Sequence, residues 1–204
     1  MLTRLAYYIP SQLKWIDSRE LSPRTFLCGY CSAKVGSANG YEFCDIKEAN
    51  PRAMASIYIC PNCLAPTYLD TNGLMHPGAP LGEPVEGVPV QASSLYEEAR
   101  RCAGVGANTA AVMLCRKLLM HIAVGVGAPE NRRFVEYVDY LVDKAYVPAS
   151  AKQWVDYIRN KGNEANHEIV LMTPDEAKHL LQFCAMLLKL IYEFPSKLPL
   201  KGKD

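Results

Sequence analysis

The sequence lacks the features that would assign it to several broad classes. It has no uninterrupted run of about eighteen apolar residues, so we predict no transmembrane helix. Its first residues lack the apolar stretch and the cleavage site of a secretory signal, and we therefore expect a cytoplasmic protein with no membrane partner. We find no P-loop, no dinucleotide-binding glycine motif and no serine nucleophile elbow.

The sequence also lacks an excess of charge of one sign. It has 22 Lys and Arg residues against 21 Asp and Glu residues, for a formal net charge of +1. This balance argues against a surface coated in positive charge for bulk nucleic-acid binding, although a local basic groove remains compatible with it. Half of the residues are hydrophobic, so we expect a folded protein with one good core or two small domains.

The composition changes near residue 90. Most of the 14 prolines precede this point, and a stretch rich in Pro and Gly lies directly before it. After Val90, apolar residues recur with the period of a helix. We predict an α+β protein that is mainly α. Its expected parts are a zinc-ribbon-like β module (residues 1–72), a linker (73–90), a helical bundle (91–195) and a tail (196–204).

About five helices are expected in the second half of the chain. Ser94 with Glu97 and Thr173 with Glu176 match the capping-box pattern, and Asn108 resembles an N-cap. The expected helices cover roughly residues 94–102, 108–125, 132–144, 150–158 and 173–194. In the first half, the segments 58–60 and 67–69 are predicted to be short strands.

Two Cys-x-x-Cys pairs stand in the predicted β module: Cys28 with Cys31, and Cys60 with Cys63. Such a turn can place two sulfurs on one side of a zinc ion, and a second turn completes a tetrahedron. We therefore predict one structural Zn²⁺, because a shell of four thiolates leaves no open position for a catalytic water. The alternatives are redox-active pairs or thiols without metal. A thioredoxin-like site, however, needs one pair in a βαβ setting, which the sequence does not show.

The other four cysteines are scattered. Cys44 could replace one metal ligand, but it stands alone. The remaining three, Cys102, Cys115 and Cys184, fall on apolar faces of expected helices, so we predict that they belong to the core.

A polar segment interrupts the apolar pattern of the second half. Within it, Asn160, Asn163 and His167 are three and four residues apart, so they share one face of a helix, and Arg159 is long enough to reach the same point. Arg can stabilise an anionic phosphate and His can move a proton near neutral pH, which suits chemistry on RNA. The alternative is structural: His167 satisfies backbone groups, and Arg159 pairs with an acidic neighbour such as Glu164 or Asp156.

A resemblance to a known family lies in the two cysteine pairs, the segment 96–99 (Tyr-Glu-Glu-Ala), the helix around 110–116 and the pattern formed by Arg159, Gly162, Asn163 and His167. The chain resembles an uncharacterised family, domain of unknown function 4145. This family is similar to the HEPN superfamily of helical bundles. The resemblance implies a metal-independent endoribonuclease of a prokaryotic toxin-type or antiviral defence system. Other HEPN-like domains are non-catalytic interaction or nucleotide-binding modules.

The resemblance implies roles for the residues of the polar segment. In a homodimer paired through its helices, His167 would transfer protons, Arg159 would stabilise charge on the phosphorus, and Asn160 and Asn163 would orient the phosphate or the imidazole. The zinc module would position RNA, DNA or a partner protein of such a system. The alternatives are a non-catalytic dimerisation or docking module and a sensor that binds a nucleotide phosphate.

Overall fold

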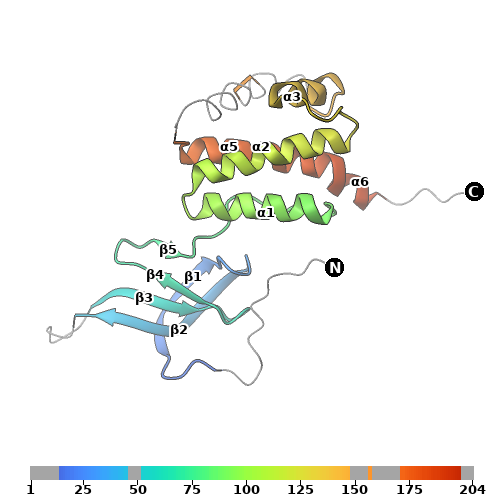
Figure 1. Ribbon diagram of the computed structural model, residues 1–204. Coiled ribbons are helices and arrows are strands. Elements are labelled where there is room, and N and C mark those ends of the chain that lie inside the picture. Colours follow the sequence, from blue (N-terminus) through green and yellow to red (C-terminus); the bar gives the residue numbers. More distant parts are fainter. Residues whose placement is uncertain (1–13, 46–51, 148–155, 158–170, 199–204) are drawn as a thin grey trace, which may run out of the picture. The chain divides into compact units, whose positions relative to one another are not determined.

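The computed structural model describes residues 14–45, 52–147, 156–157 and 171–198. The chain divides into two compact units, residues 1–80 and residues 81–204 (Figure 1). The first contains strands and the second contains helices, so the predicted α+β class is confirmed. The division between the units falls within the stretch rich in Pro and Gly.

The first unit is a five-stranded antiparallel sheet in which each strand pairs with the next one along the chain. The strands are β1 (Arg19–Leu27), β2 (Lys34–Cys44), β3 (Ala53–Ile59), β4 (Pro66–Leu69) and β5 (Met75–His76). Strand β4 contains the expected strand 67–69, and β3 contains residues 58 and 59 of the expected strand 58–60, whereas β5 comes from the segment expected to be a linker. In a meander of this kind every second turn lies at the same end of the sheet.

The core of the sheet unit is small. It contains Leu21, Phe26 and Tyr58, and the rings of Phe26 and Tyr58 lie 6.1 Å apart. Strands β2 and β3 approach each other closely at Gly40, where an added Cβ atom would lie 1.8 Å from the carbonyl oxygen of Ile57. A core of this size supplies little stabilisation, so a further link between the strands is expected.

The second unit is built from helices packed around α2. The described helical elements are α1 (Val90–Gly104), α2 (Asn108–Gly125), α3 (Phe134–Asp143), α5 (Pro174–Leu188), the π-helical turn η2 (Lys189–Glu193) and α6 (Phe194–Lys197). Helix α2 packs against α1, α3 and α5, and these helices lie side by side in Figure 1.

The observed starts of the helices can be compared with the capping residues predicted from the sequence. The hydroxyl of Thr173 accepts a hydrogen bond from the Glu176 backbone N–H, so the predicted capping box of α5 is confirmed. The capping box predicted at Ser94 is wrong, because α1 begins four residues earlier, after Pro89. Proline fixes φ and suits a helix start, and it overrides the weaker signal at Ser94. Asn108 is the first residue of α2, and the N-cap position belongs to Ala107.

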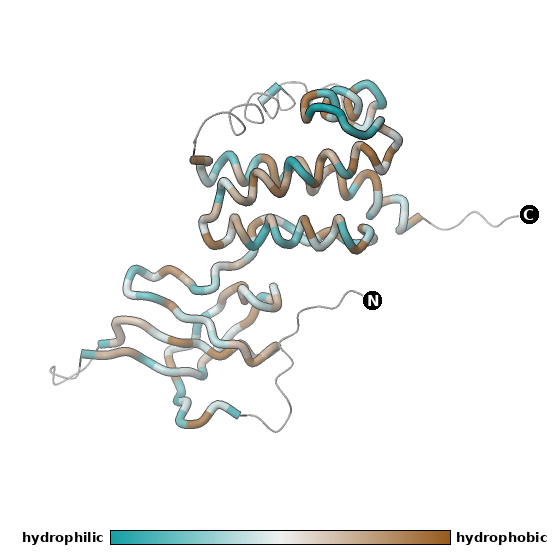
Figure 2. Tube along the Cα trace, viewed as in Figure 1, coloured by the Kyte–Doolittle hydropathy of each residue, from teal (hydrophilic) through white to brown (hydrophobic). Residues whose placement is uncertain are grey.

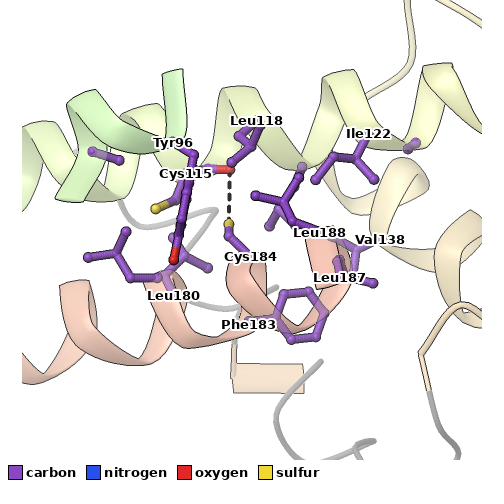
Figure 3. Packing of buried hydrophobic residues seen from close by; sticks show 14 of the residues in the cluster. Tyr96, Cys115, Leu118, Ile122, Val138, Leu180, Phe183, Cys184, Leu187 and Leu188 are labelled. Atoms are coloured by element: carbon purple, nitrogen blue, oxygen red, sulfur yellow. Dashed lines mark hydrogen bonds between the residues drawn. The ribbon is translucent and has the colours of Figure 1, made fainter. Parts of the chain in front are cut away.

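The apolar faces of α1, α2, α3 and α5 form one continuous core (Figure 3). Phe183 and Leu118 are fully buried, and the Cys184 thiol donates to the Cys115 carbonyl oxygen at 3.7 Å. Both cysteines are therefore core residues, as the sequence predicts. Figure 2 shows the alternation of hydrophobic and hydrophilic positions along these helices that is typical of amphipathic packing.

The segment 81–88 packs along the helical unit without regular secondary structure. Leu81, Val85 and Val88 pack against its core. The buried Arg100 donates from Nε to the carbonyl oxygen of Leu81 at 3.0 Å, and the Tyr96 hydroxyl donates to the carbonyl oxygen of Glu83 at 2.9 Å. The prolines and glycines prevent this segment from forming a helix or strand, so its backbone carbonyls accept hydrogen bonds from side chains instead.

None of the described helices is both long enough and apolar enough to cross a membrane.

Candidate metal centre

The two Cys-x-x-Cys pairs occupy turns at the same end of the sheet. Cys28 and Cys31 lie in the turn between β1 and β2, and Cys60 and Cys63 lie in the turn between β3 and β4. The meander separates these turns by one hairpin, which brings them together although residues 32–59 lie between them. The four residues form a cluster that could hold a metal ion.

The two turns have the same backbone hydrogen bonds. In the first, the Cys28 N–H donates to the Ala33 carbonyl at 3.0 Å, and the N–H of Ser32 donates back to the Cys28 carbonyl at 2.9 Å. In the second, the Cys60 N–H donates to the Ala65 carbonyl at 3.0 Å, with the equivalent return bond at 2.8 Å. We call each of these turns, residues 28–33 and 60–65, a knuckle.

Each knuckle contains a non-glycine residue in the left-handed region directly after its second cysteine. Ser32 has φ 58° and Leu64 has φ 60°. Such a conformation costs roughly 1–2 kcal/mol for an ordinary residue, so the surrounding hydrogen bonds must hold it. The matching alanines show that the repeated pattern in the sequence is Cys-x-x-Cys-x-Ala, and this longer repeat was missed in the sequence interpretation.

The sulfur positions fit a tetrahedral thiolate site. The Sγ atoms of Cys28 and Cys63 are 3.8 Å apart, as are those of Cys31 and Cys60, and all four lie within 4.8 Å of one another. A regular tetrahedron with Zn–S bonds of about 2.3 Å has edges of about 3.8 Å. No disulfide joins these cysteines, and such a bond would need an S–S distance of only about 2.0 Å.

The cysteines of the cluster differ in the direction in which their pKa values are shifted. Burial raises the pKa of Cys28, against the effect of nearby backbone N–H groups, and burial likewise raises the pKa of Cys63. Burial also acts to raise the pKa of Cys31, but hydrogen bonds from the Asn62 amide and the Ala33 backbone outweigh it and lower this pKa to about 7. Two of the thiols therefore favour the protonated form, and a divalent cation would compete with those protons.

The first knuckle packs closely against the chain that follows β5. A Cβ atom added to Gly29 would lie 2.4 Å from the carbonyl oxygen of Pro77 and 2.8 Å from that of Gly78. No side chain fits at this distance, so glycine at position 29 is required by close backbone approach and not by a positive φ.

Cys44 is not part of the cluster, and its thiol is free and half-buried. Cys28 and Cys60 are buried, whereas Cys31 and Cys63 are half-exposed. The site is thus more buried at Cys28 and Cys60 and lies nearer the surface at Cys31 and Cys63.

The predicted catalytic residues Arg159, Asn160, Asn163 and His167 lie outside the described residues, so their predicted roles stay predictions. The nearest described position is Tyr157, whose ring packs edge-on against His179 of α5 with centroids 5.8 Å apart. His179 is half-buried and makes this ring contact.

The chain therefore combines an antiparallel sheet that presents a four-cysteine site with a unit of packed helices. The family described as "Domain of unknown function (DUF4145)" matches residues 97–203, which is more than half of the chain, and the protein belongs to this family. The match covers the helical unit from the middle of α1 onward. Comparisons with curated proteins and with solved structures gave no match.

Proposed function

We propose that the cysteine cluster holds one structural Zn²⁺ and that the sheet unit is a zinc-ribbon-like module. The observation that supports this proposal is the pair of 3.8 Å Sγ–Sγ distances in a cluster of four free cysteines. Cys28, Cys31, Cys60 and Cys63 would be the ligands, and the ion would link two hairpins that share only a small core. The four ligands would all fall within the expected residues 1–72, and the bundle would comprise residues 91–195.

Metal analysis of the purified protein tests the zinc proposal. The expected result is one zinc per chain in the wild type and a large loss of zinc in Cys60→Ser. Cys44→Ser is the matched control, because Cys44 is a free thiol outside the cluster. Equal zinc contents in the wild type and in Cys60→Ser would reject the assignment.

We further propose that the helical unit is a HEPN-like bundle that acts as a metal-independent endoribonuclease. The support is the membership of the chain in DUF4145 together with Arg159, Asn160, Asn163 and His167 in one segment of that domain. Two copies of the chain would pair through their helices and bring both segments to one cleft. The protein would serve a prokaryotic defence or toxin-type system in the cytoplasm.

In this proposal the residues divide the chemistry among themselves. His167 assists removal of the proton from the RNA 2′-hydroxyl or gives a proton to the leaving 5′-oxygen. Arg159 stabilises the negative charge that develops on the phosphate oxygens, and Asn160 and Asn163 hold the phosphate or the imidazole tautomer. The 2′-oxygen attacks phosphorus and the 5′-oxygen leaves, so the products carry a 2′,3′-cyclic phosphate and a 5′-hydroxyl.

The test is cleavage of labelled single-stranded RNA by the zinc-loaded wild type, His167→Ala and Arg159→Ala. We expect each substitution to reduce the rate by about 100-fold or more. The matched control is His121→Ala, which removes an exposed histidine of α2 and should leave the rate unchanged. A wild type that cleaves no RNA, or a His167→Ala protein as active as the wild type, would end the nuclease proposal.

The second candidate is a non-catalytic module that docks a partner protein or nucleic acid. Two observations favour it: the net charge is +1, and seven residues separate Arg159 from His167, a longer interval than the HEPN resemblance implies. Exposed apolar side chains also occur at Leu190 and Phe194 on the last helical turns and at Leu198 directly after them. A protein that cleaves no RNA but forms a dimer in sedimentation experiments, with Phe194→Glu monomeric, would support this candidate.

A further inference from the structure

The side-chain amide of Asn62 contacts a cysteine sulfur of the other knuckle. Its Nδ2 atom donates a hydrogen bond to Cys31 Sγ at 3.4 Å. Asn62 belongs to the second knuckle and Cys31 to the first, so this bond joins the two knuckles from outside the shell of sulfurs. The Asn62 amide is not a usual zinc ligand, so this bond is a contact to the cluster from outside its four sulfurs.

The cysteine that receives this bond is one of the two less buried members of the cluster. Cys31 and Cys63 are half-exposed, and Cys28 and Cys60 are buried. A chelator, a proton or an alkylating reagent reaches the exposed sulfurs first. Loss of metal from such a site therefore begins at Cys31 or Cys63, and a group that holds the Cys31 thiolate acts where the site is most open to attack.

The amide N–H suits this position because of the charge of the shell. Four thiolates around Zn²⁺ carry a net charge of −2, and donors directed at the sulfurs reduce the charge that each sulfur presents to the solvent. A sulfur that accepts such a bond is a weaker nucleophile, and the bond also restricts the position of that sulfur. We propose that Asn62 is a positioning residue for the zinc site, which holds the Cys31 thiolate in place and shields it from reagents in the solvent.

The two knuckles are not equivalent in this respect. The position that corresponds to Asn62 in the first knuckle is Tyr30, which has no amide to donate. The backbone bonds of the knuckles match, and the Asn62 side chain of the second knuckle donates to Cys31 of the first. The proposal therefore predicts that the two exposed sulfurs respond differently when Asn62 is changed.

The experiment rests on the proposed zinc site and uses the full-length, zinc-loaded protein. Asn62→Ala removes the donor, Asn62→Asp replaces it with a carboxylate that repels a thiolate, and Asn62→Gln keeps an amide on a longer side chain. The control is Asn72→Ala, an exposed asparagine in the turn after β4 of the same unit. Three quantities are measured: zinc affinity in competition with a chromophoric chelator, the cysteine first alkylated by iodoacetamide, and the thiolate-to-cobalt bands of the Co²⁺-substituted protein.

We expect Asn62→Ala to lower zinc affinity by about 10-fold, Asn62→Asp to lower it further and Asn62→Gln to recover part of the loss. In Asn62→Ala, alkylation should move toward Cys31, and the cobalt bands should shift because one sulfur has lost a donor. An Asn62→Ala protein with wild-type affinity, alkylation order and spectrum would overturn the proposal, as would equal changes in Asn72→Ala. A wild type that binds neither zinc nor cobalt would reject the zinc assignment itself. That result is distinct from a metal-binding wild type that Asn62→Ala leaves unchanged.

Discussion

Arg100 donates from Nη1 to both carboxylate oxygens of Glu97, each at 2.8 Å, one helical turn apart on α1. The same guanidinium donates from Nη2 to the carbonyl oxygen of Gly82 at 2.7 Å and from Nε to that of Leu81. The Arg100 side chain is only 3% exposed. One side chain thus neutralises a carboxylate and satisfies two backbone carbonyls that no regular element pairs.

Replacing Arg100 with methionine should destabilise the helical unit. Methionine fills much of the same volume, but it leaves the carbonyls of Leu81 and Gly82 without their donors and the Glu97 carboxylate without its cation. We expect a loss of about 2–4 kcal/mol in the free energy of unfolding, measured by urea denaturation. Arg101→Met, at an exposed position of the same helix, should change it by less than about 0.5 kcal/mol. Equal values for the two variants would contradict the structural role given to Arg100.

Removal of the proposed Zn²⁺ should unfold the sheet unit and spare the helical unit. The sheet has a small core that includes cysteines of the cluster, whereas the helical core contains none of them. After chelation, we expect backbone amides of β2 and β3 to exchange hydrogen rapidly and those of α2 to stay protected. Hydrogen exchange followed by mass spectrometry resolves both units in one experiment. Protection of β3 that survives complete removal of zinc would show that the sheet needs no metal.

Gly29→Ala should disturb the first knuckle, whereas Gly36→Ala should not. A methyl group at position 29 meets the carbonyl oxygens of Pro77 and Gly78, and backbone must move to admit it. At Gly36, on β2, nothing lies within 4 Å of an added Cβ atom. We expect Gly29→Ala to cost about 1–3 kcal/mol of stability and to weaken zinc binding. Thermal unfolding and chelator competition measure the two effects, and a Gly29→Ala protein equal to Gly36→Ala in both would refute the close approach.

The Glu193 carboxylate should stabilise the helical unit only above acidic pH. It accepts from Lys197 Nζ at 2.7 Å and from the Glu86 backbone N–H at 3.1 Å, and the Lys197 bond is the main reason that its pKa lies below the usual value. A lowered pKa means that the stabilisation is present above the unfolded value of about 4.3 and is lost as the pH falls through the folded pKa.

The measurement for Glu193 is the Tm of the wild type and of Glu193→Gln between pH 3 and pH 7, roughly spanning the range in which carboxylates titrate. We expect the variant to melt at a lower temperature at pH 7 and the difference to disappear at the acidic end. Glu98→Gln, at an exposed position of α1, is the control and should show no such pattern. A difference in Tm that is constant across the pH range would mean that the charge of Glu193 is not responsible.

Long amphipathic helices were predictable because their apolar period decides which face is buried. The start of α5 was predictable too, since Thr173 and Glu176 form the bonds that the pattern indicates. The start of α1 was not, because Ser94 and Glu97 match a capping box while Pro89 determines where the helix begins. Strands β1 and β2 gave no clear signal, since they contain Pro23 and glycines and are held by pairing with neighbours rather than by propensity.

The cluster of four cysteines was predictable from spacing alone, because a Cys-x-x-Cys turn fixes the direction of two sulfurs. Its surroundings were not. The contact of Asn62 with Cys31 depends on how two knuckles face each other, and the need for glycine at position 29 depends on Pro77, 48 residues away. Interactions between distant segments leave no periodic trace in the sequence. The predicted roles of Arg159 and His167 await the experiments on RNA described above.

The knuckles are built by backbone hydrogen bonds, and this has a consequence for how the protein can diversify. Cys28 and Cys60 are held through main-chain groups of Ala33 and Ala65, and these hydrogen bonds use no side-chain atom of Tyr30 or Leu64. Both tips are exposed. These two residues can therefore vary among relatives without loss of the main-chain bonds that hold the four cysteines in place.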